Sequence, residues 1–170
     1  MAGERSIMIE ITGDLWDHAQ DYDVLVVPTN GVLTKDNKLV MGAGLAKQFR
    51  DKYAGIDSYF GGQLEFEHRF YCPEFLRLNQ IYYYGVLTSA TSKLDLDLDN
   101  EIVALQTEGH WKDNSDYDLV EWSVGKLWLQ HKHKKVLMTR PGCGLGKLVW
   151  SEVKEMISFL GDNFTVINKE

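Results

Sequence analysis

Two glycine-containing stretches carry the residues of this sequence best suited to bind an anion. They read M-G-A-G-L-A-K at 41–47 and R-P-G-C-G-L-G-K at 140–147. Glycine costs backbone entropy on folding, so its repetition indicates that the bare main chain is needed. Main-chain N–H groups at a helix start or in a nest-like turn bind phosphate groups. We therefore predict that both stretches bind one phosphate-containing ligand; the alternative is that the glycines only permit tight turns.

Neither stretch matches the two common nucleotide-binding motifs. A Walker A loop needs a glycine five positions before Gly146 and Ser or Thr after Lys147, but Pro141 and Leu148 stand there. The segment 42–47 lacks the third glycine of a dinucleotide fingerprint and does not directly follow its strand. The sequence therefore supports neither an ATPase nor a dehydrogenase.

Alternating strand-like and helix-like segments must position these two loops. The continuous apolar run at 24–28 is typical of a central strand that is covered on both faces. Because ligands of open α/β sheets bind beyond the carboxyl ends of the strands, we expect the two glycine loops to face one cleft. The alternation predicts a single three-layer α/β/α domain over 1–170 with a mixed sheet. The predicted strands are 7–11, 24–28, 80–87, 101–107, 135–139 and 164–167, and the predicted helices are 42–55, 114–131 and 150–160.

The strands 80–87 and 101–107 are predicted to form a long hairpin near a sheet edge, and the helix 114–131 to turn Leu119, Trp122, Leu127 and Trp128 inward. The acidic D-L-D-L-D piece at 95–99 would keep that edge soluble.

Composition narrows the class of protein. The chain has 170 residues and a net charge of −7, which disfavours general binding to a polyphosphate backbone. Two cysteines, Cys72 and Cys143, cannot form a disulfide framework, and no leader or membrane-spanning apolar run stands in the sequence. We expect a cytoplasmic, monomeric protein that does not bind a membrane.

The motifs resemble those of the macro domain, the ADP-ribose-binding α/β/α module. M-G-x-G-[IL]-A followed about 100 residues later by G-C-G-L-x-x-L-x-W is similar to the branch that contains the terminal ADP-ribose glycohydrolases and the antitoxins that remove ADP-ribose from DNA. Small stand-alone members occur in bacteria and phages. The resemblance implies a mostly parallel sheet of about six strands. The matching pieces are G-D-L at 13–15, Y-D-V-L-V-V-P-T-N-G at 22–31, M-G-A-G-L-A-K-Q-F at 41–49, T-E-G-H-W-K at 107–112 and R-P-G-C-G-L-G-K-L-V-W at 140–150.

The resemblance also implies roles for individual residues. Asp23 would accept a hydrogen bond from the adenine amino group, the backbone of Val24 would help hold the ring, and Asn30 would lie near the distal ribose. No metal or cofactor is implied. Gly42, Ala43, Gly44, Leu45 and Ala46 would line the diphosphate and distal ribose, and Gly142, Cys143, Gly144, Leu145 and Gly146 would surround the diphosphate.

The catalytic positions of the family differ here. Glu108 stands where that branch carries its catalytic lysine, and Gly146 stands where some members add an aspartate. A carboxylate inverts the charge and nucleophilicity of a lysine, so the lysine mechanism does not transfer. Glu108 with a raised pKa is a candidate general base for water at C1″, with His110 as its partner. The alternatives are that Glu108 is a solvated strand-end residue and that Trp111 packs the hairpin end onto the helix, with His110 beside it.

Two further candidates are weaker. Backbone N–H groups near Cys143 would lower its thiol pKa, but the family uses this cysteine as a small packing residue. The histidines and lysines of 131–135 fit a solvated helix end, because cations there meet the helix dipole favourably and no carboxylate or cysteine is spaced for a metal site.

Two functions remain open from the sequence. One is an enzyme that hydrolyses ADP-ribose from protein or nucleic acid, or that processes ADP-ribose 1″-phosphate. The other is a non-catalytic module that binds or sequesters ADP-ribose or a related NAD-derived signalling nucleotide. A third, structural alternative is that the glycine loops stabilise only the fold.

Overall fold

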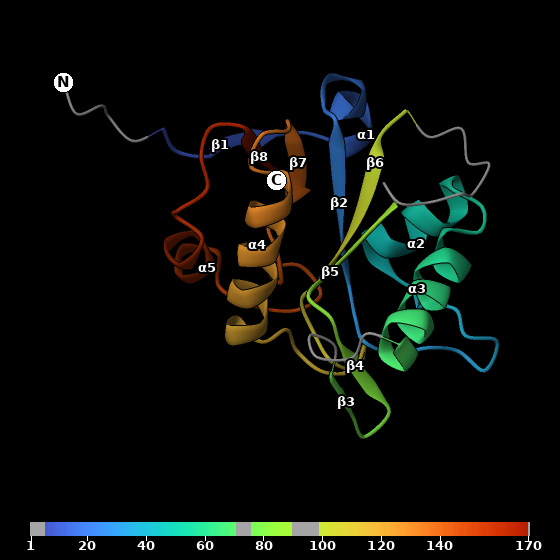
Figure 1. The fold of residues 1–170 in the computed structure, drawn as a ribbon. Helices are drawn as coiled ribbons and strands as arrows, with labels where there is room; N and C mark the ends of the chain where they lie inside the picture. Colours follow the sequence, from blue (N-terminus) through green and yellow to red (C-terminus); the bar gives the residue numbers. More distant parts are fainter. Residues whose placement is uncertain (1–5, 71–75, 90–98, 170) are drawn as a thin grey trace.

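A six-stranded sheet runs through the computed structural model, which describes residues 6–70, 76–89 and 99–169 (Figure 1). The neighbouring strands are parallel, except that β5 is antiparallel to β6. This confirms the mixed, mostly parallel sheet that the sequence predicted. The strand order is β1 (Ile9–Thr12), β8 (Phe164–Asn168), β7 (Val136–Thr139), β2 (Val24–Thr29), β6 (Glu101–Gln106) and β5 (Val86–Thr88).

The strand β2 lies in the middle of the sheet because both of its faces are apolar. Val24 and Val26 belong to the core on one face, and Leu25 and Val27 belong to the core on the other. All four side chains are buried. The continuous apolar run therefore predicted the position of this strand correctly.

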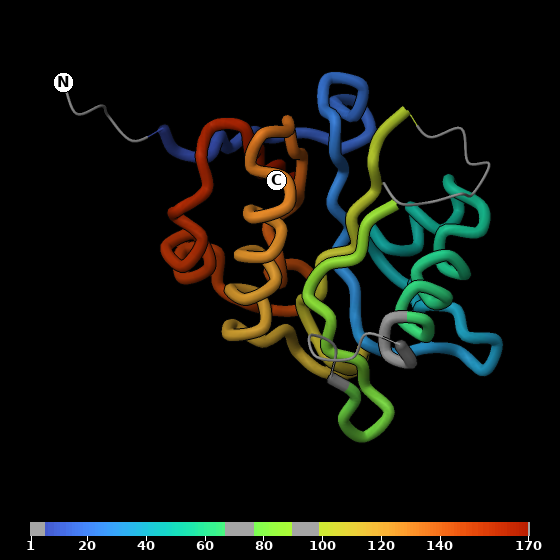
Figure 2. The backbone as a smooth tube through the Cα atoms, in the orientation of Figure 1, coloured from blue at the N-terminus to red at the C-terminus, as the bar shows by residue number. Residues whose placement is uncertain are grey.

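Helices cover both faces of the sheet, which completes the three layers (Figures 1 and 2). The helices α4 (Tyr117–His131) and α5 (Trp150–Met156) cover one face; α1 (Leu15–His18), α2 (Gly44–Lys52) and α3 (Ile56–Phe70) cover the other, and a short 3-10 turn, η1 (Ala19–Asp21), follows α1. A small separate hairpin is formed by β3 (Leu76–Leu78) and β4 (Ile81–Tyr83). We find no helix in the described residues that is long and apolar enough to cross a membrane.

The helix α4 begins later than predicted because Asp116 caps it. The Asp116 carboxylate accepts a hydrogen bond from the amide of Leu119 at 2.9 Å, so the first helical residue is Tyr117. Leu127 is buried as expected, but the expectation that Trp122 faces inward is wrong, since this side chain is 40% exposed. The Lys126 ammonium lies 4.3 Å from the centre of the Trp122 ring.

The single strand predicted at 80–87 is also wrong. Gly85 has a φ of 76°, which interrupts the extended backbone between β4 and β5. The antiparallel hairpin at the sheet edge is present, but only β5 pairs with β6. Most of the D-L-D-L-D piece that was expected to keep this edge soluble lies outside the described residues, as does Cys72.

The sequence patterns did not predict α3, whose interior contains the pair Gly61-Gly62. The structure explains the first glycine, because a Cβ atom there would lie 1.9 Å from the carbonyl oxygen of Asn37. Nothing lies within 4 Å of a Cβ atom at Gly62. One glycine therefore allows the turn at 34–38 to pack against α3, and the other has no such role.

These two glycines provide a matched stability test of the α3 packing. We expect Gly61→Ala to lower the free energy of unfolding by about 1–3 kcal/mol, as overpacking does. Gly62→Ala should raise it by about 0.5–1 kcal/mol, because alanine favours a helix interior. Chemical denaturation of both variants measures the difference, and equal effects of the two substitutions would contradict this packing.

Candidate functional site

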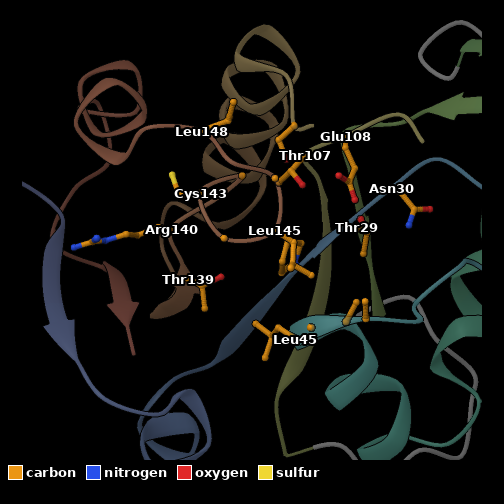
Figure 3. A pocket seen from close by; sticks show the side chains of 18 of the residues that line it. Thr29, Asn30, Leu45, Thr107, Glu108, Thr139, Arg140, Cys143, Leu145 and Leu148 are labelled. Carbon is orange, nitrogen blue, oxygen red and sulfur yellow. The ribbon is translucent and has the colours of Figure 1, made fainter. Parts of the chain in front are cut away.

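The carboxyl ends of the parallel strands open into one cavity of about 810 Å³ (Figure 3). The glycine loops that precede α2 and follow β7 both line it, as expected for loops at the carboxyl ends of strands. The end of β8 and the residues after β2 and β6 complete the wall. The lining segments are 28–30, 40–46, 107–108, 139–140, 142–146 and 167–169, together with Trp111, Ser115, Leu148 and Trp150.

The two glycine loops present main-chain donors that no described protein group accepts. In the first loop these are the amides of Gly42 to Ala46, which lie at or just before the start of α2. In the second loop the amides of Gly142, Gly144, Leu145 and Gly146 are free of described acceptors, whereas Cys143 donates to the carbonyl of Arg140 at 3.2 Å. Both sets therefore remain available to an anion in the cavity.

The glycines of the second loop divide into two kinds. Gly142 has a φ of 76°, and a Cβ atom at Gly146 would lie 2.0 Å from the hydroxyl oxygen of Ser115. Gly144, in contrast, has open space where a Cβ atom would lie, and so has Gly42 in the first loop. Fold requirements thus account for Gly142 and Gly146 and do not account for Gly42 and Gly144.

The apolar side chain of Leu145 lies between the two loops in the cavity (Figure 3). It is 74% exposed, and its Cδ1 atom lies 3.1 Å from the position of a Cβ atom at Gly44. A larger residue at 44 would therefore press on Leu145. The tip of the second loop reaches the start of α2, so the two donor sets face a shared space.

Hydrogen bonds fix the floor of the cavity at the end of β2. The Asn30 amide donates to the carbonyl of Val40 at 3.0 Å, and its oxygen accepts from the amide of Val32 at 3.0 Å. The buried Tyr84 hydroxyl donates to the Asn30 carbonyl at 2.8 Å, so the Thr29 hydroxyl donates to Tyr84. Asn30 lines the cavity as expected, but its side chain is already oriented by the protein.

Glu108 lies where an acid or base could act on the ligand. It follows β6, lines the cavity, and points toward Thr29 (Figure 3). Desolvation and then the negative charge of Asp113 raise the pKa of its carboxyl to about 7. The expected direction of this shift is confirmed, so Glu108 can exchange a proton near neutral pH.

The structure does not place His110 among the residues that line the cavity. Its Nδ1 atom accepts a hydrogen bond from the amide of Lys112 at 3.0 Å, and its ring centre lies 5.1 Å from that of Trp111. The alternative in which Trp111 packs the hairpin end onto the helix 114–131 stays a prediction; in the structure Trp111 is 50% exposed and lines the cavity.

Cys143 lines the cavity, but its thiol is not activated. The prediction that loop amides lower its pKa is wrong, because burial raises the pKa to about 11 despite the opposing charge of Arg140. The thiol donates to the carbonyl of Pro141 at 3.5 Å. A protonated, hydrogen-bonded thiol fits the packing role that the family resemblance implied.

Asp23 and Val24 lie at the opposite end of β2 from the cavity and do not line it. The Asp23 carboxylate accepts from the amide of Lys135 at 2.9 Å, and Val24 is buried within the sheet. The structure does not bring these two residues to the cavity, because β2 enters the sheet with Val24 and reaches the cavity only with Pro28.

Asp14 is an acidic residue beside the cavity wall that the prediction of site residues missed, although it is not itself a lining residue. It directly follows β1 and Gly13, and its carboxylate lies 3.8 Å from the ammonium of Lys169, a lining residue. One carboxylate oxygen caps α1 by accepting from the amide of Trp16. The signal was the G-D-L piece at 13–15, since an aspartate after a strand and before a helix belongs to the carboxyl edge of the sheet.

Several other lining residues were not predicted. Arg140 lines the cavity, and its guanidinium lies 5.0 Å from the centre of the Trp150 ring; Ser115 lies beneath the second loop. The Ser115 amide donates to the carbonyl of Gly146 at 3.0 Å, but its buried hydroxyl has no described partner. The described residues contain no group of three or more His, Cys, Asp or Glu side chains that could hold a metal ion.

Comparisons with protein-family models and with curated proteins found no match to the chain. Solved structures do match. The macrodomain of Mycobacterium tuberculosis DarG has 19% sequence identity and a TM-score of 0.63 over 97% of this chain and 99% of that one. The macrodomain of Thermus aquaticus DarG has 22% identity and a TM-score of 0.66 over 96% and 98% of the two chains.

A third match is the structure of Thermosipho africanus DarTG in complex with ADP-ribose. It has 21% identity and a TM-score of 0.64, and the match covers 95% of this chain and 43% of that chain. Together with the sheet order and the three layers, these likenesses show that the chain has the macrodomain fold and resembles the macrodomains of DarG.

Proposed function

We propose that this protein binds ADP-ribose, with the diphosphate held by the main-chain amides of the two glycine loops. The observation that carries the proposal is that both sets of amides lack described acceptors and face the same cavity. Such donors stabilise an anion without requiring a metal ion. The cavity volume of about 810 Å³ lies within the range of nucleotide-sized ligand sites.

The complex of Thermosipho africanus DarTG with ADP-ribose supports this choice of ligand, because that protein shares the fold. The rim adds positive charge through Arg140 and Lys169, which line the cavity. Both charges would favour a ligand with two phosphates, although the whole protein carries a net charge of −7.

We assign the adenine to the end of the cavity near Asp14 and the distal ribose to the end near Asn30 and Glu108. The Asp14 carboxylate has acceptor capacity beyond the α1 cap and the distant Lys169 ammonium, so it can accept from an amino group. The glycine loops lie between these ends, where the diphosphate belongs. Asp14 thus takes the role that the resemblance had suggested for Asp23.

Substitution of Gly144 tests whether the free amides bind the diphosphate. We expect Gly144→Val to raise the Kd for ADP-ribose at least about tenfold, because the side chain would enter space that no described protein atom occupies. The melting temperature should stay within about 2 °C of the wild type. Calorimetric titration and thermal denaturation measure the two quantities.

Gly146→Ala is the matched structural control for this experiment. Its Cβ atom would collide with the Ser115 hydroxyl, so we expect a lower melting temperature. If Gly144→Val lost stability and kept its affinity for ADP-ribose, the glycine loop would serve the fold alone and the proposed function would be wrong.

Replacing Asp14 tests the orientation of the ligand. Asp14→Ser retains a residue that caps α1 but removes the carboxylate, so we expect the Kd for ADP-ribose to rise about three- to tenfold. Asp23→Ser should leave the Kd unchanged, because Asp23 lies at the other end of β2. The opposite ranking of the two variants, measured by calorimetry, would reverse the assignment.

Hydrolysis at C1″ is a second candidate function, which the raised pKa of Glu108 favours. The Glu108 carboxylate would accept a proton from water as the water attacks C1″. The bond between C1″ and the modified macromolecule would break at the same step. The carrier would be an ADP-ribosylated protein or nucleic acid. Without turnover, the same site would bind or sequester ADP-ribose or a related NAD-derived nucleotide.

The pH dependence of turnover separates these functions. If Glu108 is the base, its ionised form is active, so kcat/KM should increase as the pH rises through about 7 and level off above it. Glu108→Gln should abolish turnover while ADP-ribose binding remains measurable. Unchanged turnover in Glu108→Gln would remove Glu108 from the mechanism, and absence of product from every ADP-ribosylated substrate would leave the binding function.

A further inference from the structure

The charges along the cavity change sign between its middle and its Glu108 end. The main-chain amides of the two glycine loops, which have no described acceptors, lie in the middle of the cavity. Glu108 lies in the wall at one end, where the negative charge of Asp113 acts on its carboxyl. We infer that this end accepts a planar cationic nitrogen group attached to C1″ of the bound nucleotide and rejects an anionic group there. This inference rests on the proposed binding of ADP-ribose and adds the chemical class of the group beyond its distal ribose.

Glu108 has no ion-pair partner among the described residues, although its carboxylate is half-buried. Partial burial of a carboxylate without a counter-ion disfavours its charged form. A cation on the ligand would supply that counter-ion at the point where the ligand ends. A phosphate at the same point would instead meet the negative charges of Glu108 and Asp113.

Trp111 adds an aromatic surface to the same end of the cavity. It follows Glu108 by three residues, lines the cavity, and is 50% exposed. The ammonium of the neighbouring residue Lys112 lies 5.1 Å from the centre of its ring, within the range of a cation–π contact. A planar cation on the ligand would gain ring stacking as well as charge pairing, in exchange for this exposed ammonium.

The remaining charged or titratable group beside the ring is His110, whose centre lies 5.1 Å from that of Trp111. Its Nδ1 atom accepts a hydrogen bond from the amide of Lys112 at 3.0 Å. The lysine beside the ring is Lys112, whose side chain is exposed, and the carboxylates of Glu108 and Asp113 add negative charge at this end. Exclusion of a 1″-phosphate follows from the same charges.

Two ligands carry a planar delocalised cation at C1″. One is NAD⁺, through its pyridinium ring, and the other is ADP-ribosylated arginine, through its guanidinium group. The cavity chemistry that would recognise them is shared, and direct comparison of the two distinguishes a free dinucleotide from a modified protein as the source.

Calorimetric titration at pH 8, where Glu108 is ionised, tests the inference on the whole protein. The ligands are ADP-ribose, NAD⁺, ADP-ribosyl-arginine and ADP-ribose 1″-phosphate, with ADP-ribose as the internal reference. We expect at least one cationic ligand to bind as tightly as ADP-ribose or more tightly. The 1″-phosphate should bind at least about tenfold more weakly.

Three variants identify the source of the discrimination. Glu108→Gln should reduce the ratio of the Kd for the 1″-phosphate to that for ADP-ribose at least about threefold, and should weaken the cationic ligands relative to ADP-ribose. Trp111→Leu should weaken the cationic ligands alone. Glu155→Gln, which removes an exposed carboxylate on α5 outside the cavity wall, should leave every ratio unchanged.

The outcomes separate this inference from the proposed function. Binding of ADP-ribose together with equally tight binding of the 1″-phosphate would overturn the inference and leave the proposed function in place. Weaker binding of both cationic ligands than of ADP-ribose would also overturn it, as would unchanged ratios in Glu108→Gln. Failure of ADP-ribose itself to bind would overturn the proposed function and the inference together.

Discussion

Main-chain N–H groups that find no acceptor among the described residues are the constraint on which the rest of this site depends. They occur in two loops that are about 100 residues apart in the chain, and the parallel sheet brings the loops to one cavity. Unpaired backbone donors are unfavourable unless water or a ligand accepts from them. The strand order with β2 at the centre thus determines both the fold and the place where an anion is favoured.

Steric contacts show that glycine stands at these positions for different reasons. The Ser115 side chain fills the space beside Gly146, and the Asn37 carbonyl fills the space beside Gly61 far from the site. Gly42 and Gly144 meet no described atom, although they stand in the same two motifs. A glycine in a motif is therefore not by itself evidence of ligand binding, and the space around its Cα atom separates the two roles.

The sequence predicted the parts of the structure that depend on local patterns. The alternation of strands and helices around the apolar run of β2 predicted the three layers, and the position of the glycine loops at strand ends predicted the shared cleft. The pKa direction of Glu108 also followed from its place in the cavity wall. Each of these features depends on one segment of the chain and the strand next to it.

The parts that failed depend on contacts between distant segments. The helix α3 was not predicted because it contains a glycine pair. One of these glycines is required by the turn at 34–38, which packs against α3, and the local sequence does not indicate this contact. Gly85 divided a predicted strand in which residues 81–84 and 86–87 favour extended structure. Asp14 and Asp23 differ in a local feature that was overlooked: Asp14 follows β1 and Asp23 precedes β2, so only Asp14 lies at the carboxyl edge of the parallel sheet.

The buried Tyr84 hydroxyl has a consequence for the thermodynamics of recognition. It joins the end of β2 to the edge hairpin through Thr29 and the Asn30 carbonyl, and the Asn30 side chain is held by its own two backbone contacts. A ligand that binds at this end contacts side chains whose rotamers are already fixed by hydrogen bonds within the protein. Rigid walls of this kind reduce the configurational penalty of association, so a modest number of polar contacts can yield a strong complex.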